Sequence, residues 1–151
     1  MSISIKKATI NDLERLYRIE KECFTREAFP KKLIESLLRN PRSINLMALV
    51  TDEVVGFVIA PIFEYEDKKI GRVFTLDVAV KARRKGIGQL LLRELEGMLR
   101  RLGVEFCYLE VRVDNIAARK LYQKLGYIEV ESLKDFYYAG GDAVRLTKNL
   151  K

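Results

Sequence analysis

A short basic segment with two glycines is the part of the sequence best suited to bind a ligand. It reads Arg83-Arg84-Lys85-Gly86-Ile87-Gly88 and is followed by Gln89. Glycine lets a backbone turn sharply and approach a ligand, and the first N–H groups of a helix lack intrahelical partners. With the neighbouring cations, these groups predict a phosphate site. The segment alone leaves a solvated basic turn as the alternative.

Two common nucleotide motifs do not fit this segment. A Walker loop needs Lys-Ser or Lys-Thr after its second glycine, whereas Gly88 is followed by Gln89 and Leu90. A dinucleotide fingerprint needs a third glycine three positions after Gly88, where the chain has Leu91. The phosphate-bearing ligand therefore has to be of another kind.

Composition narrows the chemistry further. There is no histidine, and Cys23 and Cys107 lie in unrelated apolar contexts. A zinc site, a Cys-His nucleophile and a Ser-His-Asp triad are unavailable in their common forms, and we expect no metal. Acid-base chemistry has to come from carboxylates, tyrosines or lysines. We interpret both cysteines as reduced core residues.

Length and charge indicate a single soluble domain over residues 1–151, with 48% hydrophobic and 32% charged residues. No apolar run approaches the ~20 residues of a membrane helix. The N-terminus alternates like a strand and lacks the apolar core of a signal peptide, which predicts a cytoplasmic protein. The net charge of +7 favours anionic partners, but it is spread along the chain, so nucleic acid is not the favoured ligand.

The elements that position the basic segment follow from periodicity. An opening strand at 2–8 precedes a helix at 11–24, whose apolar stripe includes either Ile19 or Glu20, and a second helix at 30–39. Three strands then form an antiparallel meander. The second is apolar enough to be buried, and its Gly56 marks a bulge or a close backbone approach. The three strands are expected at 43–51, 54–63 and 70–80.

The second half contains a strand-helix-strand unit. The basic segment leads into a helix at 88–102, and the strand at 105–113 should run parallel to 73–80 through a right-handed crossover. We predict an α/β fold with a mixed sheet of about seven strands and about four helices, in the order β-α-α-β-β-β-α-β-α-β-β. Its last elements are a helix at 116–125 and strands at 127–133 and 143–147.

Glu110 is the clearest candidate for acid-base work. A period of two places it in the middle of its strand, on the face opposite Cys107 and Leu109. A partly desolvated carboxylate there would be a reasonable base. An ion pair with Arg112 or with a neighbour on the sheet face is the simpler alternative.

Four other polar residues each have an ordinary structural alternative. Tyr122 carries a phenol on the less apolar side of its helix and could be a core-edge aromatic. Asn115 fits a helix cap as well as a ligand contact. Tyr137 and Tyr138 lie in a glycine-containing loop and could simply cover the edge of the core.

Taken together, the layout resembles the GNAT superfamily of acetyl-CoA-dependent N-acetyltransferases over nearly the whole chain. Three segments carry the resemblance: Arg83 to Gly88, the run from Tyr108 through Asn115, Tyr122 and Gly126 to Tyr127, and the tail from Tyr137 to Ala143. The second and third segments are similar to the branch that acetylates protein N-termini. This branch includes ribosomal-protein alanine acetyltransferases and archaeal N-terminal acetyltransferases.

The resemblance implies a role for each candidate. Backbone groups from Arg84 to Gln89 would hold the CoA pyrophosphate. Leu76, Asp77 and Val78 would offer backbone groups to the pantetheine arm where parallel strands splay apart. Asn115 and Tyr122 would close the opposite wall near the sulfur.

The reaction implied is direct attack of a neutral amine on the thioester, without an acyl-enzyme. Glu110 would be the general base, acting through a water, and Tyr122 the acid. Phe29 and Pro30, with Tyr137 and Tyr138, would clamp the first residues of a peptide. The implied acceptor is a protein N-terminus, such as that of a ribosomal protein, with a lysine side chain or small amine as alternatives. The enzyme would be a monomer or homodimer. The alternative from a different functional class is a CoA- or nucleic-acid-binding module without catalytic activity.

Overall fold

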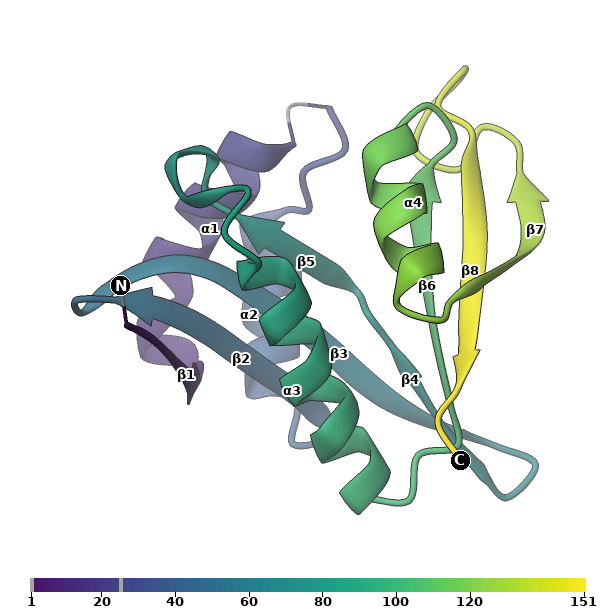
Figure 1. Cartoon of the computed structure of the whole chain (residues 1–151), viewed down its shortest axis with the longest axis horizontal. Coiled ribbons are helices and arrows are strands. Elements are labelled where there is room, and N and C mark those ends of the chain that lie inside the picture. The colour runs from purple at the N-terminus through teal and green to yellow at the C-terminus, as the bar shows by residue number, and fades with distance from the viewer. Residues whose placement is uncertain (1, 25) are drawn as a thin grey trace.

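An eight-stranded sheet runs through the molecule in the order β1-β2-β3-β4-β6-β8-β7, with β5 paired to β3 (Figure 1). The computed structural model describes residues 2–24 and 26–151. The first half contains β1 (Ile3–Lys7), α1 (Leu13–Cys23), α2 (Lys31–Arg39), β2 (Ser43–Val50), β3 (Glu53–Tyr65), β4 (Lys68–Arg72) and β5 (Thr75–Val78). The second contains α3 (Ile87–Arg101), β6 (Phe106–Arg112), α4 (Ile116–Lys124), β7 (Ile128–Leu133) and β8 (Ala143–Asn149).

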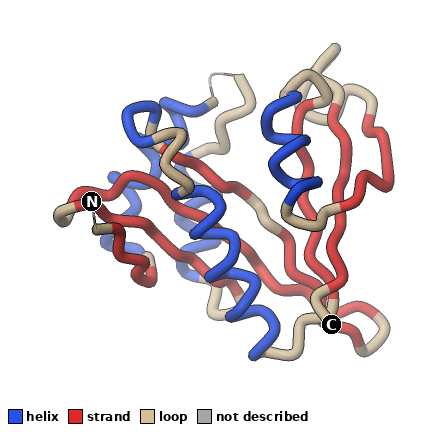
Figure 2. Tube along the Cα trace, in the orientation of Figure 1, coloured by secondary structure: helices blue, strands red, loops and turns tan. Residues whose placement is uncertain are grey.

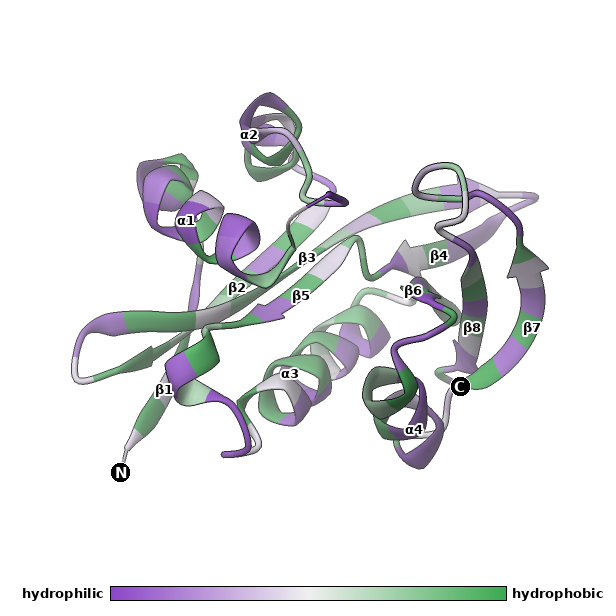
Figure 3. Ribbon diagram, turned by 90° about the horizontal axis from the view of Figure 1, so that it is seen from above, coloured by the Kyte–Doolittle hydropathy of each residue, from purple (hydrophilic) through white to green (hydrophobic). Residues whose placement is uncertain are grey.

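Helices cover the sheet on both sides. In Figure 3, α1 and α2 lie on one face, and α3 and α4 lie on the other. The strands β2 and β3 therefore bury both of their faces, which explains the near-continuous apolar character of their sequence. Alternate residues of β3 enter different cores: Val58 packs on the side of α3, and Phe57 and Ile59 pack on the side of α1 and α2. The prediction that this strand is buried is confirmed.

The order of elements agrees with the mixed sheet expected, and Figure 2 shows the strands in red with helices in blue packed against them. The observed bounds of most elements lie within two residues of those expected from periodicity. The first helix begins with a short 3-10 turn, Ile10–Asp12, in which the Thr9 and Asp12 side chains form a reciprocal capping box. None of the helices in the described ranges is long and apolar enough to cross a bilayer.

One expected strand, 70–80, is wrong as a single element. The structure divides it into β4 and β5, and Val80 belongs to a second 3-10 turn, Val80–Ala82. The reason is an exchange of partners. The Val73 N–H donates to Tyr108 O of β6 at 2.8 Å, whereas the next N–H, that of Phe74, donates to Ile59 O of β3 at 2.8 Å. Hydrogen bonding thus passes from one neighbour to the other within two residues.

The expected parallel pairing is present, but only in β4. Ile70, Gly71 and Arg72 face Phe106, Cys107 and Tyr108 of β6 in parallel register. Beyond Arg72 the two strands separate, because β5 remains with β3 and β6 continues along β8. Figure 1 shows β5 and β6 diverging from this short seam.

A buried polar network joins α3 to the second half of the sheet. Glu96 is 4% exposed. Its carboxylate accepts from the Tyr127 hydroxyl at 2.7 Å and from Lys148 Nζ at 2.8 Å. The same ammonium donates to Leu125 O at the end of α4. Every charged atom in this network has a partner, which is the condition for burying charge without a large penalty.

Gly56 tests how closely β5 and α3 approach β3. A Cβ at this position would lie 2.9 Å from Asp77 O, so the expected close approach is present. We predict that Gly56→Ala lowers the free energy of unfolding by about 2 kcal/mol, because the backbone on both sides has to shift. Chemical denaturation would measure the change.

Gly97→Ala is the matched control for Gly56→Ala. Gly97 lies inside α3, and its added Cβ would meet only the flexible Arg101 side chain at 3.6 Å. Replacing a mid-helix glycine by alanine should stabilise the protein by up to about 1 kcal/mol. Equal effects of the two substitutions would contradict the close approach at Gly56.

Candidate active site

The basic segment forms the N-terminus of α3. Gly86 is the N-cap with a φ of 76°, a conformation that L side chains rarely adopt, and α3 begins at Ile87. The first intrahelical bond here runs from Leu90 N to Gly86 O. The N–H groups of Ile87, Gly88 and Gln89 therefore point out of the helix end, and no side chain caps them. Such an end attracts an anion.

The side chains of the segment divide into two groups. Arg84 and Lys85 are exposed beside the helix start, and Arg84 adopts a φ of 64°. Ile87 is 1% exposed and belongs to the core, so only its backbone is available to a ligand. Arg83 turns back toward the sheet, where its guanidinium donates to Val78 O at 3.1 Å and to Cys23 Sγ at 3.4 Å.

Both cysteines are free and unsuited to nucleophilic attack. Burial is the main cause that raises the pKa of Cys23 to about 11. Burial likewise raises the pKa of Cys107 to about 12. A neutral thiol is a poor nucleophile, so neither residue is an activated cysteine.

Within the described part of the chain, the diverging strands leave the peptide N–H groups on the inner edge of β5 without a partner strand, whereas Val78 O accepts from Arg83 Nε and Cys23 Sγ. Ala79 N–H donates to Val55 O at 2.8 Å, which sets the alternation of the antiparallel β3–β5 ladder. By this alternation Asp77 bonds toward β3, while the peptide groups of Leu76 and Val78 point away from it, toward the splay. These are the two residues whose backbone was expected to meet the pantetheine arm. The Asp77 side chain is buried on the α1 side.

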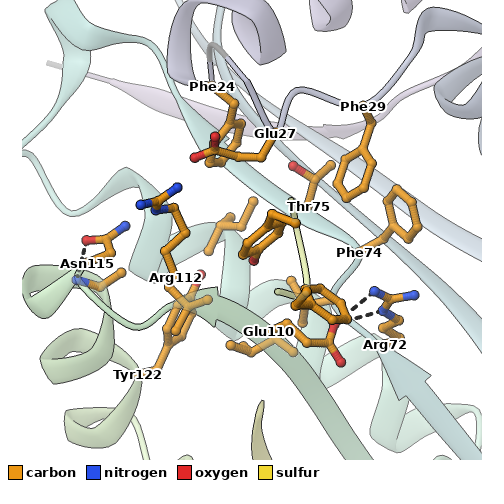
Figure 4. Close-up of a pocket in the computed structure, with 17 residues that line it drawn as sticks. Phe24, Glu27, Phe29, Arg72, Phe74, Thr75, Glu110, Arg112, Asn115 and Tyr122 are labelled. Carbon is orange, nitrogen blue, oxygen red and sulfur yellow. Dashed lines mark hydrogen bonds and ion pairs between the residues drawn. The ribbon is translucent and has the colours of Figure 1, made fainter. Parts of the chain in front are cut away.

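A cavity of about 140 Å³ lies where β5 and β6 separate (Figure 4). Side chains from β5, β6, α4, the α1–α2 loop and the β7–β8 loop contribute to its lining. Sequence reasoning had singled out six of the lining residues, namely Phe29, Leu76, Glu110, Asn115, Tyr122 and Tyr137. The structure thus brings together residues that are far apart in the chain.

Glu110 faces this cavity and is held by two guanidinium groups. Its Oε1 accepts from Arg72 at 2.9 and 3.1 Å, and its Oε2 accepts from Arg145 Nε at 2.8 Å. Only 3% of the Glu110 side chain is exposed. The ion pair with sheet-face neighbours is therefore realised, since Arg145 lies directly opposite Glu110 on β8. Arg112, the other expected partner, instead pairs with Asp114.

Tyr122 and Asn115 line the cavity from α4. Asn115 caps this helix by accepting from Ala118 N at 3.2 Å, so the expected cap is present. Burial is the main cause that raises the pKa of Tyr122 well above its ordinary value. The phenol therefore keeps its proton at neutral pH and is able to donate a hydrogen bond. Its ring packs edge-on against Tyr127, with centroids 5.8 Å apart.

The four residues expected to clamp a substrate occupy different places. Phe29 lines the cavity and stacks on Phe74, with ring centroids 4.2 Å apart. Tyr137 also lines it, and burial is the main cause that raises its pKa to about 12. Pro30 is exposed and forms the N-cap of α2, outside the lining.

Tyr138 also lies outside the cavity lining and links two loops instead. Its ring lies 3.7 Å from the Arg26 guanidinium carbon, and its hydroxyl contacts Arg112. The Arg26 contact connects the α1–α2 loop to the β7–β8 loop. Tyr138 thus holds together the two loops that carry Phe29 and Tyr137.

Sequence reasoning missed several lining residues, of which Glu27 is the most important. It is the second carboxylate of the lining, beside Phe24 (Figure 4). The signal for it was weak, because Glu27 lies in a charged, irregular loop. Arg72 was also missed, since its contact with Glu110 depends on the parallel seam between β4 and β6.

The uncapped helix start suits a phosphate group, and the cavity beside it contains two carboxylates and two phenols that could take part in acid-base chemistry. Residues 13–127 match the model of the acetyltransferase (GNAT) family. The chain belongs to this family.

The chain is similar to several N-acetyltransferases over most of its length. The N-alpha-acetyltransferase of Sulfurisphaera tokodaii is 32% identical over 149 residues, which cover 92% of this chain and 88% of that protein. The ribosomal protein bS18-alanine N-acetyltransferase of Haemophilus influenzae is 33% identical over 129 residues, covering 83% and 82%. The crystal structure of Ard1 from Thermoplasma volcanium superimposes with a TM-score of 0.88 at 26% identity, covering 99% and 98%. The expected fold, the N-acetyltransferase class and acetyl-CoA as cosubstrate are confirmed.

The left-handed Gly86 provides a test of the helix start. We predict that Gly86→Ala lowers stability by about 1 kcal/mol through backbone strain. It should also weaken CoA binding about tenfold, because the N–H groups of α3 lose their alignment. Isothermal titration with CoA would measure the affinity.

Gly103→Ala is the control, since Gly103 follows the other end of α3 with a φ of 79° and has open space around its Cβ position. It should reproduce the loss of stability and leave CoA affinity unchanged. A similar loss of affinity in both variants would show that general destabilisation causes it.

Proposed function

We propose that the protein transfers the acetyl group of acetyl-CoA to the N-terminal α-amine of a protein or peptide, by direct attack and without an acyl-enzyme. The observation that carries this proposal is the small cavity between β5 and β6, whose lining combines aromatic rings with charged and polar side chains. Phe24, Phe29, Phe74, Phe136 and Tyr137 contribute rings to its lining. A pocket of this size suits the first residue of a peptide better than a long polycation, which would need several carboxylates.

The donor side rests on the inner edge of β5 and the start of α3. The N–H groups of Ile87, Gly88 and Gln89 would hold the pyrophosphate, with Arg84 and Lys85 adding positive charge beside it. The peptide groups of Leu76 and Val78 would hold the pantetheine arm. The Val78 N–H points into the splay and would polarise the thioester oxygen.

The acceptor amine has to attack as a neutral group. An α-amine titrates near ~8 and a lysine near ~10.4, a difference of about 3.3 kcal/mol in the cost of deprotonation. The α-amine is therefore the easier nucleophile near neutral pH. The raised pKa values of Cys23 and Cys107 support direct attack, since neither thiol is ionised enough to form an acyl-enzyme.

Glu110 would take the proton from the attacking amine, and Tyr122 would stabilise the departing thiolate. Because Arg72 and Arg145 hold both oxygens of Glu110 on the sheet, it would reach the amine through a water rather than by moving. Tyr122 would donate a hydrogen bond to the departing thiolate. Its raised pKa favours such donation over complete loss of the phenolic proton.

The names of two relatives guide the choice of acceptor. One is described as an N-alpha-acetyltransferase, and another as acting on the alanine of a ribosomal protein. A peptide that begins with alanine, like a ribosomal protein terminus, is therefore the first acceptor to test.

For the proton transfers, we predict that Glu110→Gln lowers kcat about 10²- to 10³-fold and that Tyr122→Phe lowers it about 10²-fold. Acetyl-CoA should still bind to both variants. Steady-state release of CoA would provide the rates. Glu131→Gln is the control, because Glu131 pairs with the same Arg145 from β7, the edge strand of the sheet.

Glu27→Gln distinguishes between the two carboxylates of the cavity. If Glu27→Gln abolishes turnover while Glu110→Gln retains it, the base is Glu27 and the assignment to Glu110 is wrong.

For the acceptor, we predict turnover of peptides with a free α-amine and none of the same peptides with a blocked N-terminus and an internal lysine. The kcat/KM should rise with pH and level off near ~8, because the α-amine is then neutral. Activity on polyamines alone, or a rate that continues to rise toward the lysine range, would contradict the proposal.

A further inference from the structure

Three buried residues form a polar cluster between α1 and β5. Glu20 is 0% exposed, Asp77 1% and Thr75 5%. The Thr75 hydroxyl lies 2.9 Å from Glu20 Oε1 and 2.6 Å from Asp77 Oδ1. A hydroxyl has one proton and can donate to only one acceptor at a time. The second short contact needs a proton on one of the two carboxyl groups.

No cation contacts these carboxyl groups within the described residues. The nearest guanidinium, that of Arg83, donates to Val78 O and Cys23 Sγ instead. Asp77 Oδ2 is buried and has no hydrogen-bond partner when it is treated as an acceptor. If this oxygen carries a proton, it can donate a hydrogen bond. Glu20 lies within hydrogen-bonding reach of Asp77.

The other buried glutamates of the molecule differ in this respect. Glu96 is paired with Lys148, and Glu110 is paired with Arg72 and Arg145. Two adjacent carboxylates without a cation would place two negative charges in the core, which is costly enough that such pairs retain a proton.

We propose that Glu20 and Asp77 share one proton, with Asp77 as its carrier, and that the pair is a positioning device that fixes the acceptor loop to strand β5. Burial, followed by the neighbouring Glu20, raises the pKa of Asp77 well above its ordinary value.

The cluster connects both substrates of the proposed reaction. Glu20 Oε2 accepts from Phe29 N at 3.0 Å, and Phe29 lines the cavity at the acceptor end. Thr75 and Asp77 flank Leu76, whose peptide groups face the donor side. Neutralising one carboxyl lets the buried Glu20 hold the loop backbone without repulsion from β5.

Infrared spectroscopy of the full chain at neutral pH would detect the shared proton directly. The carbonyl stretch of a buried, protonated carboxyl should be present in the wild type and absent from Asp77→Asn. Asp52→Asn, in the exposed β2–β3 turn, is the control and should leave the band unchanged. Absence of the band from the wild type, or its persistence in Asp77→Asn, would overturn the shared proton.

Stability as a function of pH gives a second readout. The folded protein binds the Asp77 proton more tightly than the unfolded chain does, whose aspartate titrates near ~3.9. The stabilisation is complete below that pH and is lost as pH rises through the raised pKa. Asp77→Asn should therefore gain stability relative to the wild type as pH rises.

Among the described residues, four charged or titratable groups surround Asp77. They are Glu20 and Cys23 of α1, Arg83 of the segment before α3, and Tyr122 of α4. Cys23→Ser removes the thiol and leaves the carboxyl pair in place. The pH dependence of stability should therefore be the same in Cys23→Ser as in the wild type. A pH-independent difference between Asp77→Asn and the wild type would contradict the proposal.

Positioning of the loop is tested by a matched pair at Glu20. Glu20→Met removes the acceptor of the Phe29 amide, and Glu20→Gln retains an oxygen in its place. Hydrogen exchange of the Phe29 amide should accelerate about tenfold in Glu20→Met and remain near wild type in Glu20→Gln. If Glu20→Met does not fold, Thr75→Val severs the same link to β5 and should also accelerate exchange. Unchanged exchange in the folded variant would overturn the positioning role.

A kinetic test of the positioning role rests on the proposed N-terminal acetylation. Glu20→Met should raise the KM for the peptide about tenfold and leave the KM for acetyl-CoA within about threefold, with Glu20→Gln restoring the peptide KM. Equal changes in both KM values would indicate a general structural effect. If the wild type acetylates no peptide at all, the proposed function fails, and infrared and exchange measurements still decide the inference.

Discussion

The exchange of hydrogen-bond partners at Val73 and Phe74 is the constraint on which the rest of the molecule depends. One N–H bonds to β6 and the next bonds to β3, so the chain forms a short parallel seam and then leaves it. The divergence turns the peptide groups of Leu76 and Val78 toward open space, and it exposes Glu110 to the same space from the other side. In a continuous sheet the peptide groups of β5 would bond to those of β6, and no space for a thioester would remain between the two strands.

The molecule buries its carboxylates in two ways, and each suits a different task. Glu96 is held by Lys148 and the Tyr127 hydroxyl, which suits a structural cross-link, and Glu110 is held by two guanidinium groups, which suits the rigid base proposed above. Glu20 and Asp77 have no such cations, and a retained proton takes their place in the proposal above. In the proposal, only the second arrangement depends on a proton that the folded protein retains.

Much of this architecture was predictable because hydrophobic periodicity is a local property. The helices, the buried strand around Gly56 and the basic helix start all followed from it. The break after Arg72 did not, because strand propensity does not show which neighbouring strand a residue bonds to, and only this choice of partner separates β4 from β5. The Glu110 ion pair with Arg145 depends on register between β6 and β8, which no local pattern contains. The ambiguity between Ile19 and Glu20 on one helix stripe was an unrecognised sign of a buried carboxyl group.

The position of β8 has a consequence for how the sheet is held together. β7 precedes β8 in the chain, yet β8 lies between β6 and β7 in the sheet. Among the described residues β7 bonds only to β8, so its place in the sheet depends on a strand that follows it in the chain. The same strand brings Arg145 opposite Glu110. A truncation that removed β8 would therefore detach β7 from the sheet and also remove one of the two cations that hold Glu110.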